Sequence, residues 1–204
     1  MPNRGPWAAC KIQADRHYAM KTLSPPLDED AQRELLALAR TTLESYFTTG
    51  RVQESAIRNP ALRRRSGAFV TLHKGNDLRG CIGLISDEGE LCRTVQRCVL
   101  SAALEDSRFA PVTREEVAAL SIEISVLSPA QRVTDMGQIE VGRHGLIVSS
   151  GGFRGLLLPQ VASKYEWDRE TFLAQTCRKA GLPATAWNRP GTVIQIFEAQ
   201  VFSE

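Results

Sequence analysis

The sequence has few of the residues and motifs from which common catalytic and metal-binding sites are built. Its 204 residues include three histidines, which disfavours a histidine-rich metal site. Its five cysteines include no Cys-x-x-Cys pair, the usual signature of a zinc or thioredoxin-like site. A glycine-rich phosphate loop and a Gly-x-Ser-x-Gly nucleophile motif are also missing from the sequence. No complete catalytic constellation of these types is present, and we predict neither a metal site nor a bound cofactor.

Long apolar runs and a strong net charge are lacking too. No run approaches the roughly 18–20 apolar residues that a membrane-spanning helix needs, and the segment from Met1 to Met20 has no apolar core of a secretory signal. The 25 basic and 23 acidic residues give a formal charge of +2, too small to argue for nucleic acid or an anionic membrane as the main partner. We therefore predict a cytoplasmic protein with reduced thiols.

The first part of the chain shows no clear hydrophobic periodicity. We interpret residues 1–21 as a loosely ordered N-terminal extension. An alternative is that the natural chain begins at Met20.

Hydrophobic periodicity and capping residues predict the main elements. Helices are expected over residues 28–47, 90–105 and 168–180, and strands over 67–73, 78–85, 121–127, 139–141, 146–149, 155–158 and 192–202. Helices mix with antiparallel hairpins, and no regular alternation of strand and crossover helix is visible. The predicted fold class is α+β, with a mixed, largely antiparallel sheet flanked by helices.

A hairpin at residues 67–85 contains the least usual segment of the sequence. Gly75-Asn76 is a good two-residue turn, because glycine accepts a positive φ and asparagine tolerates it. A regular ladder from this turn pairs Val70 with Cys81. Since side chains alternate between faces, it places Arg79 on the face of Cys81 and His73 on the opposite one.

The segment Arg79-Gly80-Cys81-Ile82-Gly83 has two interpretations. Glycine weakens a strand interior, so Gly80 and Gly83 suggest a close backbone approach or a bend. A guanidinium near Cys81 would favour the reactive thiolate, and amides beside the glycines could bind an anion. Alternatively, Cys81 is a buried apolar filler and the glycines mark a bulge.

Other side chains are candidate partners of Cys81. His144 lies on a turn between two glycines and could act as a base, or be a hydrogen-bonded structural histidine. Glu123 and Ser125 project from the polar face of their strand and could line a cleft or meet solvent. Gln160 is a possible polar lining residue.

The polar turn that follows the second helix is predicted to have a structural role. In it, Asp106 and Arg108 are expected to form a local pair.

Several ordered segments together resemble the AMMECR domain family, whose prokaryotic members are called AmmeMemoRadiSam system protein A. The resemblance covers about residues 22–203 and rests on Leu78–Gly83 together with residues 67–72, 106–109, 122–127, 142–146, 155–161 and 167–182. It implies a single domain over residues 22–204 with a larger and a smaller lobe, and with Leu78–Gly83 at their junction, lining a cleft.

The resemblance implies little about activity. It suggests an association, by gene context, with a Memo-like protein and a radical-SAM protein, and a candidate ligand-binding or active-site cleft formed by Arg79, Gly80, Cys81, Ile82 and Gly83. Three functions stay open. Cys81 could be the nucleophile or redox thiol of an enzyme acting on an unknown small molecule, with His144 or Glu123 handling protons. The domain could instead be a non-catalytic adaptor, or a metal-binding module.

Overall fold

The computed structural model describes residues 12–13, 25–53, 56–85 and 89–204. The predicted extension, residues 1–21, lies outside this part of the chain except for Ile12–Gln13. The described residues form two compact units, which are treated separately. Of the described residues, the first unit contains Ile12–Gln13, Pro25–Val126 and Gln200–Glu204, and the second contains Leu127–Ala199. Helices and antiparallel sheets occur together, which confirms the predicted α+β class.

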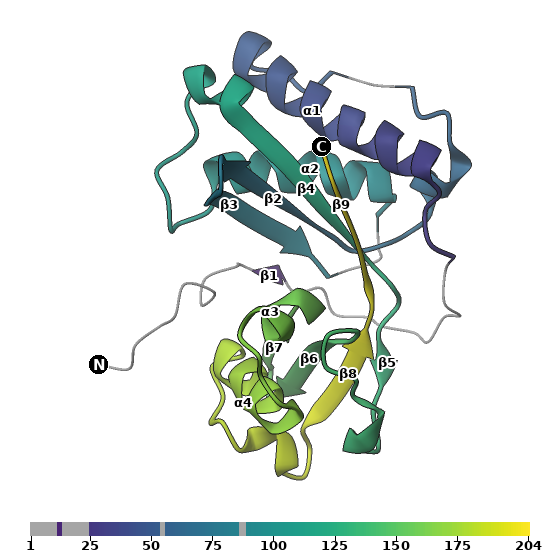
Figure 1. Ribbon diagram of the computed structural model, residues 1–204, viewed down its shortest axis with the longest axis vertical. Coiled ribbons are helices and arrows are strands. Elements are labelled where there is room, and N and C mark those ends of the chain that lie inside the picture. Colours follow the sequence, from purple (N-terminus) through teal and green to yellow (C-terminus); the bar gives the residue numbers. More distant parts are fainter. Residues whose placement is uncertain (1–11, 14–24, 54–55, 86–88) are drawn as a thin grey trace. The chain divides into compact units, whose positions relative to one another are not determined.

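The first unit is a five-stranded sheet in the order β1-β3-β2-β4-β9, packed against two long helices (Figure 1). Strand β1 is parallel to β3, whereas β2 is antiparallel to both β3 and β4, so the sheet is mixed. The elements are β1 (Ile12–Gln13), α1 (Glu29–Thr49), η1 (Pro60–Arg63), β2 (Ala68–Lys74), β3 (Asp77–Leu84), α2 (Leu91–Leu104), η2 (Arg114–Ala119), β4 (Leu120–Leu127) and β9 (Ala199–Ser203).

Helix α1 shows how local sequence sets an element's ends. The Asp28 carboxylate accepts a hydrogen bond from the Ala31 amide at 2.8 Å, which satisfies one of the free donors of the first turn. Gly50 ends the helix with a φ of 72°, a left-handed conformation that glycine adopts without a Cβ clash. The apolar stripe of α1, including Leu35 and Leu43, is fully buried in the core of the first unit.

The hairpin of β2 and β3 has the predicted turn but not the predicted register. Lys74 pairs with Asp77 as expected, but β3 then contains an extra residue, Arg79, in a β-bulge. The bulge shifts the ladder by one residue, so Cys81 pairs with Thr71 rather than with Val70. The prediction that Cys81 shares a face with Val70 is therefore wrong.

The two glycines that flank Cys81 allow close packing on opposite faces of β3. A Cβ on Gly80 would overlap the carbonyl oxygen of Ala102, so α2 lies directly against the strand backbone at this point. A Cβ on Gly83 would overlap the ring of Phe69, which lies over that position. Another group therefore packs closely against the backbone at each of the two glycines. This is the close backbone approach that the sequence led us to expect.

The second unit is a four-stranded sheet in the order β5-β8-β6-β7 with two helices. Its elements are β5 (Gln131–Arg132), η3 (Met136–Gln138), β6 (Gly145–Ser150), β7 (Phe153–Leu157), α3 (Pro159–Lys164), α4 (Arg169–Lys179), η4 (Ala186–Asn188) and β8 (Val193–Phe197).

Three sequence predictions for the C-terminal half need correction. Residues 139–141 form no strand, because Ile139 caps the short helix η3 and a turn follows. Residues 192–202 are not one strand, because Glu198 separates β8 from β9, which belong to different sheets. The strand over residues 155–158 was expected to run into a turn at Pro159-Gln160, but these two residues begin helix α3, for which Pro159 supplies a favourable first position.

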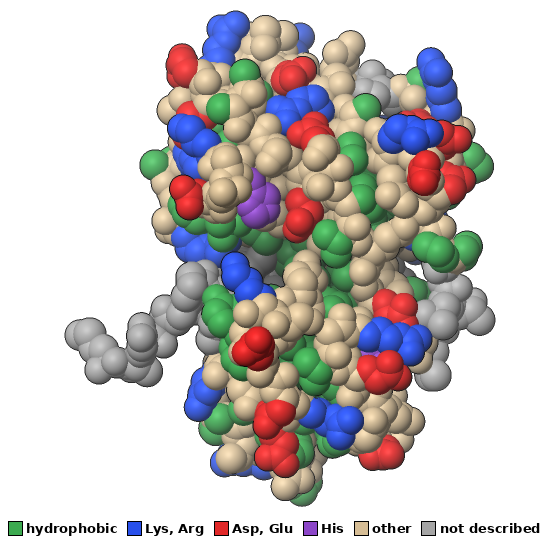
Figure 2. Space-filling view, viewed as in Figure 1, with side chains coloured by type: hydrophobic (Ala, Val, Ile, Leu, Met, Phe, Trp, Pro, Cys, Tyr) green, Lys and Arg blue, Asp and Glu red, His purple; other side chains and the backbone are tan. Residues whose placement is uncertain are grey.

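The surface carries charges of both signs. Lys and Arg side chains are interspersed with Asp and Glu side chains on the face seen in Figure 2, as the small formal charge of +2 leads one to expect. In the described residues, none of the helices has the length and apolarity needed to cross a membrane.

Candidate functional site

One face of the five-stranded sheet gathers polar side chains from three neighbouring strands. Gly80 points toward α2, so Val70, Leu72 and Ile82 on the same side belong to the core. The opposite side is termed here the Cys81 face. It carries Phe69, Thr71 and His73 from β2, Cys81 and Gly83 from β3, and Ser121, Glu123 and Ser125 from β4.

Cys81 lies at one end of a row that crosses this face. It is directly opposite Thr71, which in turn is directly opposite Glu123 on β4. The Thr71 hydroxyl donates a hydrogen bond to the Cys81 Sγ over 3.4 Å. A hydroxyl that donates to sulfur stabilises a thiolate more than a thiol. Glu123 is partly exposed in the same row.

Cys81 differs from the other described cysteines in its exposure. It is partly exposed, whereas the cysteines of α2 and α4 are buried. Burial raises the pKa of the Cys98 thiol to about 12 and also raises the pKa of Cys177. Both thiols are therefore unreactive near neutral pH, since the thiolate is the nucleophile.

A buried ion pair holds the backbone of Cys81 in place. The Cys81 amide donates to the Asp106 carboxylate at 2.9 Å, on the side of β3 that faces away from β2. Arg108 binds the same carboxylate through Nη2 at 2.6 Å and Nε at 2.9 Å, and its Nη2 also lies 3.5 Å from the Cys81 carbonyl oxygen. The predicted pairing of Asp106 with Arg108 is confirmed. Together they occupy the edge of β3 as a neighbouring strand would.

Asp106 is ionised in spite of its burial. Its side chain is 1% exposed. Burial alone would raise its pKa, but the hydrogen bonds from the Arg108 guanidinium and from the amides of Cys81 and Arg108 outweigh this effect. The pKa of Asp106 is therefore lowered below its ordinary value of 3.8.

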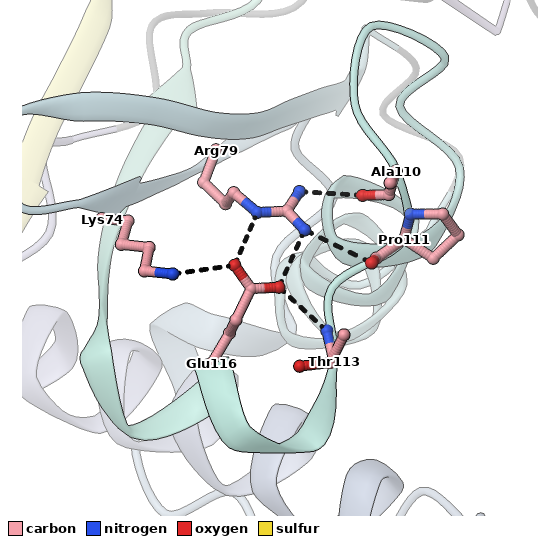
Figure 3. Close-up of polar contacts among 6 residues, drawn as sticks. All are labelled: Lys74, Arg79, Ala110, Pro111, Thr113 and Glu116. Atoms are coloured by element: carbon pink, nitrogen blue, oxygen red, sulfur yellow. Dashed lines mark hydrogen bonds and ion pairs between the residues drawn. The ribbon is translucent and has the colours of Figure 1, made fainter.

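The bulge residue Arg79 is part of a separate polar network (Figure 3). Its guanidinium binds the two carboxylate oxygens of Glu116 at 3.1 and 2.9 Å and donates to the carbonyls of Ala110 and Pro111 at 2.9 and 3.3 Å. Lys74 adds a third bond to Glu116 at 3.1 Å. The Arg79 guanidinium is thus bound to η2 and to the loop before it, whereas we expected it beside the Cys81 thiol.

Glu116→Gln is expected to make the stability of the fold depend less on pH below pH 4.5. Hydrogen bonds from Arg79, the Thr113 amide and Lys74 lower the pKa of Glu116 to about 2, from an ordinary value of 4.5. The ionised carboxylate therefore stabilises the fold fully above pH 4.5, and this contribution is lost as the pH falls toward 2. Urea midpoints measured down to pH 2 should fall less steeply for the variant than for the wild type.

The matched control for this measurement is Glu29→Gln. Glu29 pairs with Arg33 at the surface, where its side chain is 89% exposed. This substitution should leave the slope of the profile unchanged, because exposed pairs contribute little. Equal slopes for both variants below pH 4.5 would contradict the role assigned to Glu116.

Of the remaining candidate residues, one lies on the Cys81 face and two lie in the second unit. Ser125 is on the Cys81 face and is 2% exposed. His144 and Gln160 belong to the second unit, in the loop before β6 and in α3. The imidazole of His144 accepts a hydrogen bond from the Glu140 amide at its Nδ1, 3.0 Å away, which is the structural role considered for it from the sequence.

Two residues of the Cys81 face were missed in the sequence. A regular ladder, which pairs Val70 with Cys81, would place both Thr71 and His73 on the face opposite to Cys81. The bulge at Arg79 brings both onto the face of Cys81. A bulge was one interpretation of Gly80 and Gly83, and the structure has a bulge at Arg79, beside Gly80. The residue types do not indicate which residue is the extra one, so the register could not be corrected from the sequence.

Comparison with known proteins agrees with the earlier resemblance. The AMMECR1 family matches residues 36–202 of the chain. A protein of Thermococcus gammatolerans is 42% identical over 181 residues, which cover 83% of this chain and 88% of that protein. A protein of Methanothermobacter thermautotrophicus is 40% identical over 186 residues, covering 88% and 97% of the two chains.

A solved structure has the same fold. The crystal structure of an uncharacterised protein from Pyrococcus horikoshii matches with a TM-score of 0.80 and 40% sequence identity, over 84% of this chain and 90% of that one. The sequence match spans most of the first unit and nearly all of the second. The chain therefore belongs to the AMMECR1 family.

Proposed function

We propose that the Cys81 face is the functional site of this protein and that it binds a small molecule between Cys81 and Glu123. The observation that carries the proposal is the hydrogen bond from Thr71 to the Sγ of a partly exposed cysteine whose backbone is fixed by Asp106. A cysteine that served only as filler would require neither a donor to its sulfur nor a buried carboxylate on its amide.

The spacing of the strands defines how a ligand would lie. Neighbouring strands are about 4.8 Å apart, so the backbones of Cys81 and Glu123, two strands apart, are separated by about 10 Å. This is too far for the two side chains to act as a directly bonded dyad. It suits a ligand a few atoms long, with the thiol at one end, the carboxylate at the other and the Thr71 hydroxyl in between.

His73 extends the site on the side of the hairpin turn. It is two residues from Thr71 on β2 and directly opposite Ser121 on β4. Diagonal neighbours on a sheet face are about 7–8 Å apart, within reach of long side chains and of a bound ligand. His73 replaces His144 as the histidine proposed to act with Cys81, as a proton donor or acceptor toward a ligand.

Selective alkylation tests this function. In the native protein, iodoacetamide should label Cys81 faster than an unfolded cysteine peptide at neutral pH, and Cys98 and Cys177 should not react. Thr71→Val should slow the labelling of Cys81 about tenfold, because it removes a hydrogen bond to a charged group. Peptide mapping by mass spectrometry gives each rate.

Thr71→Ser is the matched control, since it keeps the hydroxyl and loses only a methyl group. It should label at nearly the wild-type rate. The proposal fails if Cys81 reacts no faster than the unfolded peptide, or if the valine and serine variants are labelled equally.

The partners suggested by the family are a separate proposal. We infer from family membership that the protein acts with a Memo-like protein and a radical-SAM protein, and that Cys81→Ser would preserve such a complex if the protein is an adaptor. Co-purification at micromolar concentration tests this. The metal-binding alternative has less support, because no three His, Cys, Asp or Glu side chains cluster suitably in the residues that the structure describes.

A further inference from the structure

The Cys81 face carries an acidic side chain that has no counter-ion. Of the residues that define this face, Glu123 is the one with a carboxylate, and none is a lysine or an arginine. Glu123 projects from β4, which lies inside the sheet between β2 and β9, and it is only partly exposed. In the described part of the chain, its side chain has neither an ion pair nor a hydrogen bond. The face therefore offers a negative charge that the protein itself does not neutralise.

The cations near the hairpin already bind other carboxylates. Arg79 and Lys74 bind Glu116 at 2.9 and 3.1 Å (Figure 3), and Lys74 is also 52% exposed to water. Arg108 binds Asp106 at 2.6 Å at the edge of β3. A rotation of one of these side chains toward the Cys81 face would take a cation away from its own carboxylate. A counter-ion for the Cys81 face would therefore come from a ligand.

The hydrogen bonds of the same row determine what a ligand must supply. A threonine hydroxyl has one proton, and that of Thr71 is donated to the Cys81 Sγ at 3.4 Å. Toward a ligand, the Thr71 oxygen can then only accept. The ionised carboxylate of Glu123 can only accept as well, and so can a thiolate at Cys81. The row thus presents acceptors in succession, and a ligand that lies along it must carry donors.

We propose that the ligand of the Cys81 face is a small organic cation with several N–H donors, an alkylammonium or an alkylguanidinium. This inference rests on the proposed function and names the class of its ligand. The charged end lies between Glu123 and Thr71, whose strands are neighbours with backbones about 4.8 Å apart, and donates to both. The alkyl chain extends across the face toward Cys81. An anion would meet the carboxylate with no cation on the face to offset the repulsion.

The two head groups would use the acceptors differently. A guanidinium is a planar fork that can bind both oxygens of the Glu123 carboxylate and still has N–H groups left for Thr71. An ammonium is a compact charge with three donors on a freely rotating group, so it can bind both residues but with less fixed geometry. Both satisfy the acceptors, and their relative affinities distinguish them.

Four compounds with the same butyl chain test the ligand class. In NMR spectra of the full-length protein labelled with nitrogen-15, n-butylguanidinium and n-butylammonium should shift the amides of Thr71 and Glu123 saturably. Saturation in the millimolar range is expected for such small ligands. N-butylurea keeps N–H donors without the charge, and butyltrimethylammonium keeps the charge without N–H donors. Each should bind about tenfold more weakly than the N–H cations, because each lacks one part of a charged hydrogen bond.

A matched pair of variants locates the binding site. Glu123→Gln keeps the size of the side chain and removes its charge, so it should weaken the binding of both N–H cations about tenfold. Glu29→Gln removes a carboxylate that is 89% exposed on α1 and should bind them like the wild type. The comparison of the four compounds uses the wild type, so it holds even if Glu123→Gln does not fold. Butylurea or butyltrimethylammonium binding as tightly as the N–H cations would overturn the inference.

Alkylation of Cys81 separates this inference from the proposed function. Its rate without ligand tests the function, and saturating n-butylguanidinium should slow it, because the butyl chain lies over the thiol. If Cys81 reacts quickly and depends on Thr71, but neither N–H cation shifts the face saturably, the ligand class is wrong and the proposed function stands. If Cys81 reacts no faster than an unfolded peptide, both are overturned.

Discussion

Asp106→Ala is expected to lower the free energy of unfolding by about 3–5 kcal/mol, the usual effect of removing one partner of a buried ion pair. The Asp106 side chain is 1% exposed, and the change leaves three donor groups without their acceptor: the Cys81 amide, the Arg108 amide and the Arg108 guanidinium. The Arg108 side chain is itself 16% exposed, so a largely buried positive charge would lose its carboxylate. Urea denaturation at neutral pH measures the loss.

Two further substitutions complete this test. One separates the effect of the charge from that of the hydrogen bonds, and the other is a surface control. Asp106→Asn keeps an oxygen that can accept from the Cys81 amide but loses the ion pair, so its effect should lie between those of wild type and alanine. Asp30→Ala removes a carboxylate that pairs with Arg33 at the surface, with 82% of its side chain exposed, and should leave stability unchanged within error. Similar effects of Asp106→Ala and Asp30→Ala would show that the buried pair does not hold β3.

The links between Asp106, Arg108 and Cys81 illustrate what sequence patterns can and cannot predict. The Asp106–Arg108 pair was predictable, because the residues are two apart in one turn. Its attachment to the Cys81 amide spans 25 positions and depends on how α2 returns the chain to the edge of β3. Local sequence propensities do not encode that contact. The hydrogen bond between the Cys81 amide and Asp106 therefore could not be predicted from the sequence.

Helix ends were predicted better than strand register, for a physical reason. Capping is local: Asp28 and Asp168 each accept an amide hydrogen bond from a residue three positions on, and Gly50 ends α1. Register depends on every residue from the turn onward, and a single inserted residue moves all later side chains to the other face. The extra residue Arg79 therefore moved residues 80–83 to the face opposite to the expected one, whereas Leu78 keeps its expected partner His73.

This exchange changes what the candidate site contains. With the regular ladder, Cys81 would lie against α2 among Val70 and Leu72. With the bulge, Gly80 faces helix α2 and the Cys81 side chain contacts Thr71. The composition of the motif fits this arrangement, since Gly80 is small where a helix approaches and Cys81 is partly exposed where polar groups gather.

Gly80→Ala is the second change expected to have a large effect. An added Cβ would overlap the carbonyl oxygen of Ala102, near the end of α2, and would lie 3.0 Å from its carbonyl carbon. These are backbone atoms of a packed helix, so no side chain can rotate away and α2 itself must shift. We expect the free energy of unfolding to fall by about 3 kcal/mol, the upper end of the usual range for overpacking. Thermal and urea unfolding both measure it.

Gly89→Ala is the matched control for this steric argument. Its added Cβ would lie 3.7 Å from the Thr94 hydroxyl, at an ordinary contact distance, so the same change of residue should leave stability nearly unchanged. Glycine-to-alanine changes also reduce the entropy of the unfolded chain, an effect that the two variants share and that their difference removes. If both variants lose the same stability, close approach of α2 cannot be the reason for a glycine at position 80. A large loss for Gly80→Ala alone would show that the residue before Cys81 is fixed by the helix behind the sheet.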